Sequence, residues 1–186
     1  MNRKTFLPLA PLLVLAACSG GLSGLSSLPA SSAGNYHLSA GDKVRLTVLG
    51  FDNITNQYTV DDAGMLSLPM LNAVSVEGKS TAQVEALIAG MLEQRSLARN
   101  ANVSVQMVEY RPFYILGEVQ KPGQYAYVPG MTVLTAVSIA GGYTFRAKRN
   151  LVAISRSDDG RVVKWRAAQT DRILPGDIVE VVEGTL

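Results

Sequence analysis

Apolar and polar side chains alternate most clearly at residues 43–49. Val44, Leu46 and Val48 alternate with Lys43, Arg45 and Thr47. This period of two predicts a strand with one buried face. Further short strands are expected at residues 58–60, 65–69 and 102–108, with Asp61-Asp62-Ala63-Gly64 as a hairpin turn.

A different period marks one helix between these strands. Its apolar residues recur at helical spacing and form one stripe: Val84, Leu87, Ile88, Met91 and Leu92. Ser80 and Gln83 match a capping box just before the stripe. The pattern therefore predicts an amphipathic helix that packs on the sheet.

The second half of the chain begins with a predicted hairpin followed by a helix. Residues 113–119 and 124–128 are β-prone, and Pro122-Gly123 separates them, with Gly123 expected to take the positive φ of a type II turn. Residues 132–140 read as a short helix that ends at Gly141-Gly142.

Two more elements complete the predicted second unit. Residues 151–156 and 161–165 form a hairpin across Asp158-Asp159-Gly160, and residues 174–181 form a final turn and strand. The whole pattern predicts an α+β fold with two small domains, at residues 36–110 and 111–186.

The N-terminus reads as a targeting segment. Arg3 and Lys4 precede an apolar run at residues 6–17 that is too short to span a bilayer. The following Leu-Ala-Ala-Cys resembles the lipobox of bacterial lipoproteins, which implies a signal peptide at 1–17 and a lipidated Cys18. Residues 18–35, rich in Gly and Ser, are expected to form a flexible tether.

Charge and cysteine content exclude several classes. The chain has 17 basic and 15 acidic residues, and removal of Arg3 and Lys4 with the signal leaves 15 of each. A neutral mature chain argues against nucleic-acid binding. Cys18 is the single cysteine, so the chain has no internal disulfide.

Little in the sequence favours catalysis, a metal or a cofactor. His37 is the single histidine, which argues against a histidine triad or a multi-histidine metal site. Asp42, Asp62 and Asp177 lie beside a glycine or in a turn, where such side chains accept backbone hydrogen bonds. A pair of these carboxylates for glycoside hydrolysis is the alternative interpretation.

Residues 146–172 are basic, and the candidate contact residues lie at the start of this span or just before it. Arg146, Lys148 and Arg149, with the aromatic side chains of Tyr143 and Phe145, are candidates for contact with a polysaccharide or a protein partner. The alternative is that these charges form a solvated outer face of two strands.

Two motifs resemble known bacterial domains. Gly117-Glu118-Val119, Lys121-Pro122-Gly123, Tyr125 and Ala140-Gly141-Gly142 resemble the soluble-ligand-binding β-grasp (SLBB) module, as does the closing Leu174-Pro175-Gly176-Asp177. Before them, GDKVRLTVLG and V-x-D-x-G-x-L-x-LP resemble a polysaccharide export domain. In this order they resemble a short form of the outer-membrane polysaccharide export (OPX) lipoprotein family. Gly117, Glu118, Pro122, Gly123, Gly141, Gly142, Gly176 and Asp177 would then be structural motif residues.

That resemblance implies a passive role in polysaccharide export. Copies would form a homo-oligomeric ring, lipid-anchored at the periplasmic face of the outer membrane, with an inner-membrane polysaccharide copolymerase as partner and a polysaccharide chain as cargo. Longer family members add further modules and a membrane-crossing helix, so a separate β-barrel outer-membrane channel is expected. The alternatives are a lipoprotein that binds a soluble ligand through its β-grasp domain and, third, a glycan hydrolase.

Overall fold

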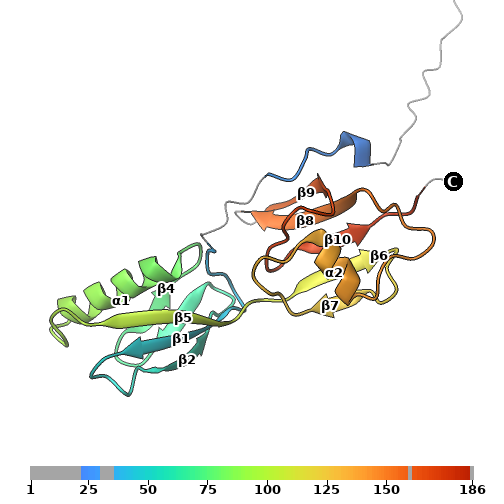
Figure 1. The fold of residues 1–186 in the computed structure, drawn as a ribbon. Coiled ribbons are helices and arrows are strands. Elements are labelled where there is room, and N and C mark those ends of the chain that lie inside the picture. Colours follow the sequence, from blue (N-terminus) through green and yellow to red (C-terminus); the bar gives the residue numbers. More distant parts are fainter. Residues whose placement is uncertain (1–21, 30–35, 159–160, 185–186) are drawn as a thin grey trace, which may run out of the picture.

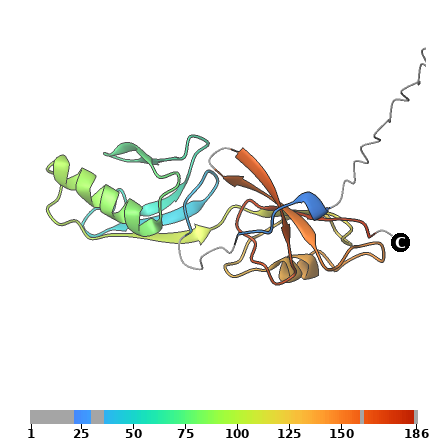
Figure 2. The same ribbon diagram turned by 90° about the horizontal axis from the view of Figure 1, so that it is seen from above.

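The computed structural model describes residues 22–29, 36–158 and 161–184. The predicted signal peptide and Cys18 lie outside these residues. The described part folds as two units joined between β5 and β6 (Figure 1), and Figure 2 shows the same elongated arrangement from above.

The first unit contains two small sheets and one long helix. Its elements are β1 (Lys43–Val48), β2 (Asn56–Thr59), β3 (Met65–Leu68), β4 (Asn72–Ser75), α1 (Thr81–Gln94) and β5 (Val103–Glu109). Among the described residues the strands pair as β2-β1-β5 and as β3-β4, all antiparallel. The helix α1 packs against β5, as Figure 1 shows.

The periodic patterns in this unit correspond to the observed elements. β1 alternates exposed and buried residues along its whole length. In α1, the Ser80 hydroxyl accepts from the Gln83 amide and the Gln83 side chain accepts from the Ser80 amide. Val84, Ile88 and Leu92 are buried against the sheet. Both the strand and the capped helix are therefore confirmed.

Two details of the first unit differ from the sequence prediction. β3 pairs with β4, a strand that the pattern did not predict, because residues 69–71 turn the chain back with Met70 and Asn72 at positive φ. The turn at 61–64 forms, but its carboxylate is that of Asp61. Its Oδ1 accepts from the Ala63 and Met65 amides, whereas Asp62 is exposed.

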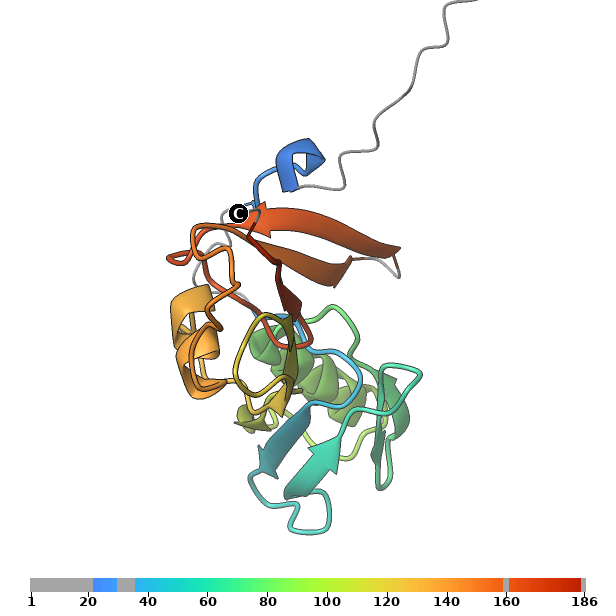
Figure 3. The same cartoon turned by 90° about the vertical axis from the view of Figure 1, so that its right-hand side faces the viewer.

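The second unit is a five-stranded mixed sheet with a short helix. Its elements are β6 (Phe113–Gly117), β7 (Gly123–Tyr125), α2 (Val133–Ile139), β8 (Val152–Asp158), β9 (Arg161–Ala167) and β10 (Ile178–Val181). The strand order is β7-β6-β10-β8-β9, with β10 parallel to β6 and the other pairs antiparallel. Figure 3 shows α2 to one side of this unit and the β8–β9 hairpin at its top.

The second unit confirms the predicted elements except at one turn. The β8–β9 hairpin forms a seven-residue ladder, and its residues 159–160 lie outside the described part. The prediction that Gly123 takes a positive φ is wrong. Gly123 instead begins β7 and pairs with Ile115, so its backbone is extended.

Each unit has its own hydrophobic core. The first is formed by α1 and the strands β1, β3, β4 and β5, and includes Leu46, Ile88 and Val105. The second lies between the sheet and α2 and includes Phe113, Ile154 and Val179. Two cores of this kind, each with strands and a helix, confirm the α+β class.

Part of the predicted flexible tether is attached to the second unit. Ser27 forms a parallel bridge with Arg166 at the edge of β9, and Leu22–Gly24 forms a short 3-10 helix, η1, just before it. The Leu28 amide donates to the Arg166 carbonyl at 2.9 Å, and the Arg166 amide donates to the Ser26 carbonyl at 3.0 Å. Residues 26–28 of the expected flexible tether are therefore hydrogen-bonded to β9.

Candidate functional site

The Gly-Glu-Val motif lies where β6 passes very close to the end of β10. Gly117 adopts φ +83°, and a Cβ at this position would lie 2.1 Å from the Val181 carbonyl oxygen. No side chain fits at that distance, so only glycine allows this approach. The following amide of Glu118 donates to the same Val181 carbonyl at 2.9 Å.

The residues after Gly117 cross the chain that follows α2. The Glu118 carboxylate accepts a hydrogen bond from the Thr144 hydroxyl, and the Thr144 amide donates to the Glu118 carbonyl at 3.1 Å. Val119 forms an antiparallel bridge with Tyr143. The Gly117-Glu118-Val119 motif and the residues that follow Gly141-Gly142 therefore contact each other where the two chain segments cross.

The glycine pair ends α2 by a Schellman motif. The Gly141 amide donates to the Ser138 carbonyl at 3.1 Å, and the Gly142 amide donates to the Val137 carbonyl at 2.9 Å. Gly141 also lies close to the chain it crosses, since a Cβ there would be 3.1 Å from the Gln120 Cβ. A capping role with close backbone approach is confirmed for this pair.

Pro122 and Lys121 lie on the exposed connection between β6 and β7. The Lys121 carbonyl accepts from the Tyr125 hydroxyl at 2.6 Å, which holds the connection over the second core. Neither residue contacts the candidate basic residues through a hydrogen bond among the described residues.

The candidate contact residues occupy one loop but are not equivalent. Arg146 is paired with the Glu183 carboxylate, which raises the pKa of the guanidinium. The Tyr143 hydroxyl is buried, and burial raises its pKa. Phe145, with 92% of its surface exposed, and the exposed Lys148 and Arg149 remain available for contact.

The two units carry the same Gly-Asp turn, once at residues 38–42 and once at residues 173–177. In each turn the glycine has a positive φ and the aspartate is fully buried. Asp42 Oδ2 accepts from the Ser39 amide at 2.9 Å, and Asp177 Oδ2 accepts from the Leu174 amide at 2.8 Å. Both turns lead directly into a strand, so the expected turn role of these two aspartates is confirmed.

Arg111 joins the two turns. Its backbone amide donates to Asp42 Oδ1 at 3.0 Å, and its Nε donates to the Pro175 carbonyl at 3.0 Å. Gly176 has φ +83°, and a Cβ on it would lie 2.9 Å from that Nε, so a side chain there would be strained and would displace the Arg111 side chain. We call Asp42, Arg111, Pro175 and Gly176 the interdomain clamp.

Aromatic side chains surround the clamp. The rings of Tyr36 and Tyr110 meet edge to face at 5.0 Å, and those of Tyr110 and Tyr127 at 5.5 Å. The Tyr36 hydroxyl donates to Asp42 Oδ2 at 2.6 Å. Burial, and then the Asp42 carboxylate, raise the pKa of Tyr36 well above its ordinary value.

The second turn aspartate is held by a buried ion pair. The Asp177 carboxylate accepts hydrogen bonds from Nε and from a terminal nitrogen of Arg156, each at 2.8 Å. The Arg156 side chain is 15% exposed and that of Asp177 is fully buried. This bidentate geometry gives each charge a direct partner, which a buried charge requires.

The described residues provide no arrangement typical of catalysis. No group of three or more potential metal ligands occurs among them. The Asp42 and Asp177 carboxylates accept hydrogen bonds from the surrounding turn and junction groups, and His37 is exposed. The clamp is a positioning device, and sequence reasoning missed Arg111 because its partners lie 64 and 69 residues away.

Two families match the chain in tandem. Residues 30–108 match the polysaccharide biosynthesis/export protein family, and residues 112–164 match the SLBB domain. The junction between the matches falls at the clamp. The chain therefore belongs to the polysaccharide export (OPX) family and contains an export domain followed by an SLBB domain.

The curated relatives that the chain matches are longer proteins. Over 144 residues the chain is 36% identical to the exopolysaccharide production protein ExoF of Rhizobium meliloti, which covers 69% of this chain and 34% of ExoF. It is 28% identical over 142 residues to the polysialic acid transport protein KpsD of Escherichia coli, which covers 73% of this chain and 25% of KpsD. The chain thus spans about a third of ExoF and a quarter of KpsD.

These comparisons place the chain among proteins of polysaccharide export. The matched family and the KpsD relative are described as export or transport proteins. In the part of the chain that the structure describes, neither α1 nor α2 nor the short 3-10 helix has the length and hydropathy of a membrane-crossing helix.

Proposed function

We propose that this protein is a lipid-anchored periplasmic component of a bacterial polysaccharide export complex. Copies assemble side by side into a ring, and the ring guides a growing polysaccharide from an inner-membrane copolymerase toward an outer-membrane channel. The tandem match to an export domain and an SLBB domain supports the export role. Lipid attachment at Cys18 is inferred from the sequence around that residue.

The mechanism is passive guidance, without a bond-making step. The buried carboxylates of Asp42 and Asp177 are engaged by donors in the turns and the junction, so they are poorly placed for general acid and base work. His37 is exposed and is the single histidine of the chain. The protein therefore acts through its shape and its contacts.

The interdomain clamp is the observation that best supports an assembly role. A closed ring requires a fixed rotation between neighbouring copies, and a subunit of two loosely joined domains does not define one. Arg111 hydrogen-bonds to the first domain through its amide and to the second through its side chain. This fixes the relation of the two domains, so each copy can present the same contact surfaces.

The test is the mass of the lipidated protein, extracted in mild detergent with Cys18 intact. The proposal predicts a closed multi-subunit particle with a central opening in electron micrographs. A stable monomer with one saturable site for a soluble ligand would instead indicate a ligand-binding lipoprotein, and would contradict the ring.

A further inference from the structure

One loop of the SLBB domain combines an exposed aromatic side chain with unpaired cations. Phe145 is 92% exposed, the highest value among the large apolar side chains of the described residues. Lys148 and Arg149 are exposed three and four residues later. With the acidic side chains that the structure describes, these two form no ion pair, whereas Arg146 is paired with Glu183. We call residues 145–149 the Phe145 loop.

The attached N-terminal segment meets the SLBB domain at the same end as this loop. Ser27 bridges to Arg166, whose neighbour Ala167 pairs with Val152 at the start of β8. Just before that strand, the Arg149 carbonyl accepts from the Gln169 side chain at 2.6 Å. The segment therefore reaches β9 close to the Phe145 loop, although the export domain lies between them in sequence.

This attachment limits where a lipid on Cys18 can lie. Three residues lie between Cys18 and Leu22, which is buried in the structure. The four residue steps from Cys18 to Leu22 span at most about 14 Å when extended. If Cys18 carries an acyl chain, that chain starts within this distance of Leu22, and so near the end of the SLBB domain where residues 26–28 meet β9.

Charge is distributed unequally between the two domains, and the distribution agrees with an SLBB domain that faces the membrane. Residues 36–110 contain 5 basic and 8 acidic side chains, while residues 111–186 contain 10 basic and 7 acidic ones. A neutral chain thus has a negative export domain and a positive SLBB domain. An anionic phospholipid surface attracts the positive one.

We propose that the Phe145 loop contacts an anionic phospholipid surface, with the Phe145 ring among the headgroups and Lys148 and Arg149 against lipid phosphates. An aromatic ring beside basic side chains is suited to that interface. This rests on the proposed function only in placing the protein at a bacterial membrane. It adds a second contact to the lipid anchor, and so fixes which domain faces the bilayer.

An acidic polysaccharide is the other anionic partner that these cations fit, and the loop is less suited to it. Sugar rings stack on aromatic side chains that are held in a supported position. The Tyr143 hydroxyl is buried, and Phe145 projects with almost its whole surface free of contact. A projecting, unsupported ring suits insertion into a fluid surface better than stacking on a sugar.

The test uses the unlipidated chain of residues 19–186, which keeps every described residue and has no cysteine. Its binding is measured by cosedimentation with vesicles of phosphatidylglycerol and phosphatidylethanolamine, and with vesicles of phosphatidylcholine alone. We expect binding to the anionic vesicles that weakens with added salt. Changing Lys148→Glu together with Arg149→Glu should weaken it by about tenfold or more.

A matched control carries the same charge change on the other domain. Arg45→Glu together with Arg99→Glu reverses two exposed cations of the export domain, and should alter vesicle binding by less than about twofold. An equal loss in both double variants would show attraction through net charge alone, and would overturn the proposal. Thermal unfolding of each variant establishes that the fold is retained.

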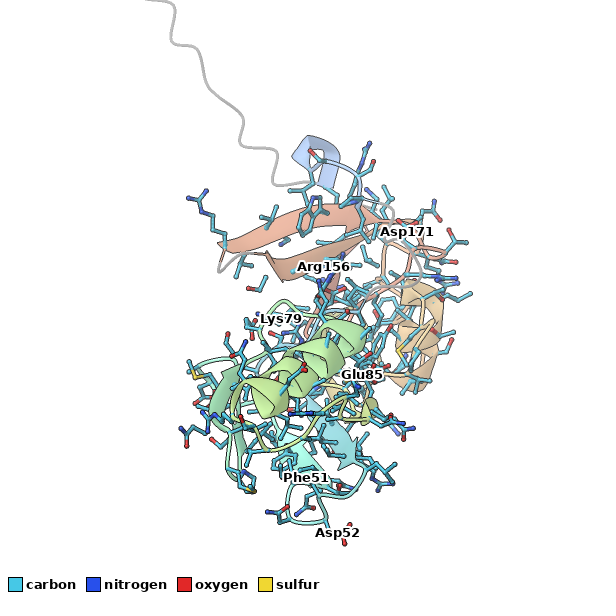
Figure 4. All side chains as sticks on the ribbon, turned by 90° about the vertical axis from the view of Figure 1, so that its left-hand side faces the viewer. Phe51, Asp52, Lys79, Glu85, Arg156 and Asp171 are labelled. Carbon is cyan, nitrogen blue, oxygen red and sulfur yellow. The ribbon has the colours of Figure 1, made fainter. Side chains whose placement is uncertain are left out.

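A fluorescent probe then locates the contact. With Phe145→Cys labelled by an environment-sensitive dye, anionic vesicles should shift its emission to the blue. The same dye at Asp52→Cys should not respond, since Figure 4 shows Asp52 at the tip of the export domain, far from Asp171 of the SLBB domain. Equal response at both positions, or none at position 145, would contradict the proposal.

The outcome also separates this inference from the proposed function. If the loop variants keep vesicle binding but lose binding to polysialic acid, used as a probe acidic polysaccharide, the loop is a cargo contact and the proposal is wrong. If the lipidated protein forms a particle of ring size but the Phe145 loop does not bind vesicles, this inference alone is overturned. A monomeric particle would contradict the ring whatever the vesicles show.

Discussion

The Asp42 carboxylate accepts a hydrogen bond at 3.0 Å from the backbone amide of Arg111, a residue 69 positions later in the chain. Asp42 belongs to the turn that starts the export domain, and Arg111 begins the SLBB domain. Because the Arg111 side chain also reaches the Pro175 carbonyl, one residue links the equivalent turns of both domains. A few polar contacts therefore set the orientation of one domain relative to the other.

Replacing Asp42 should loosen the junction while both domains stay folded. Asp42→Asn substitutes a neutral group for a buried carboxylate that accepts three hydrogen bonds, at a cost of about 2 kcal/mol. We expect independent tumbling of the two domains in NMR relaxation measurements.

Asp177→Asn is the matched control, since the hydrogen-bond donors to the Asp177 carboxylate, Leu174 and Arg156, both lie in the SLBB domain. It leaves the Arg156 charge buried without a partner, so it should lower the free energy of unfolding by about 3 kcal/mol or more. Its domains should still tumble as one body. Joint tumbling in Asp42→Asn would contradict the clamp.

Gly117 should be the least replaceable glycine of the SLBB domain. Gly117→Ala places a methyl group 2.1 Å from the Val181 carbonyl oxygen, which forces β6 and β10 apart. We expect a loss of more than about 3 kcal/mol in urea unfolding. Gly142→Ala is the control, because that glycine has φ +92° but open space around it, and should cost only about 1 kcal/mol. Equal losses would mean that the close approach is not what requires glycine.

The stability of the junction should fall in alkaline solution. The folded-state pKa of Tyr36 is raised above its ordinary value near 10, so its neutral form stabilises the fold. That contribution is complete below about pH 10 and is lost as the pH rises above it. Tyr36→Phe should cost about 1 kcal/mol at neutral pH and make the alkaline decline shallower. Identical declines in both proteins, measured by urea unfolding between neutral pH and about pH 11, would exclude Tyr36 as the source.

The attachment of the N-terminal segment depends on two backbone hydrogen bonds. Leu28→Pro removes the amide that donates to the Arg166 carbonyl. Amide hydrogen exchange at Arg166 should then accelerate, because its own bond to the Ser26 carbonyl is lost with the released segment. Ser26→Pro stiffens the same segment and keeps both bonds, so Arg166 should stay protected there. Unchanged exchange in Leu28→Pro would argue against attachment.

The sequence predicted those features that depend on local pattern. The alternation at Val44, Leu46 and Val48, and the capping box at Ser80 and Gln83, are set by neighbouring residues and were confirmed. β4 escaped notice because Asn72-Ala-Val-Ser shows no alternation, and its turn requires two non-glycine residues at positive φ.

The features that the sequence did not reveal depend on distant contacts. Gly123 is extended because its strand pairs with β6, which overrides the Pro-Gly turn preference. Arg111 looks like an ordinary boundary residue until both Gly-Asp turns are seen around it. The shared pattern of these turns, a buried aliphatic residue three positions before Gly-Asp and an alternating strand after it, was the available signal. Lys148 and Arg149 are exposed, and their contact with a polysaccharide or a partner stays a prediction.

The central claim, that this chain is a passive component of polysaccharide export, is tested most directly by deleting its gene and measuring where the polymer accumulates. We predict that polysaccharide synthesis continues while the finished polymer is trapped in the periplasm, and that the intact chain restores release. Normal amounts of polymer outside the deletion strain would contradict the account.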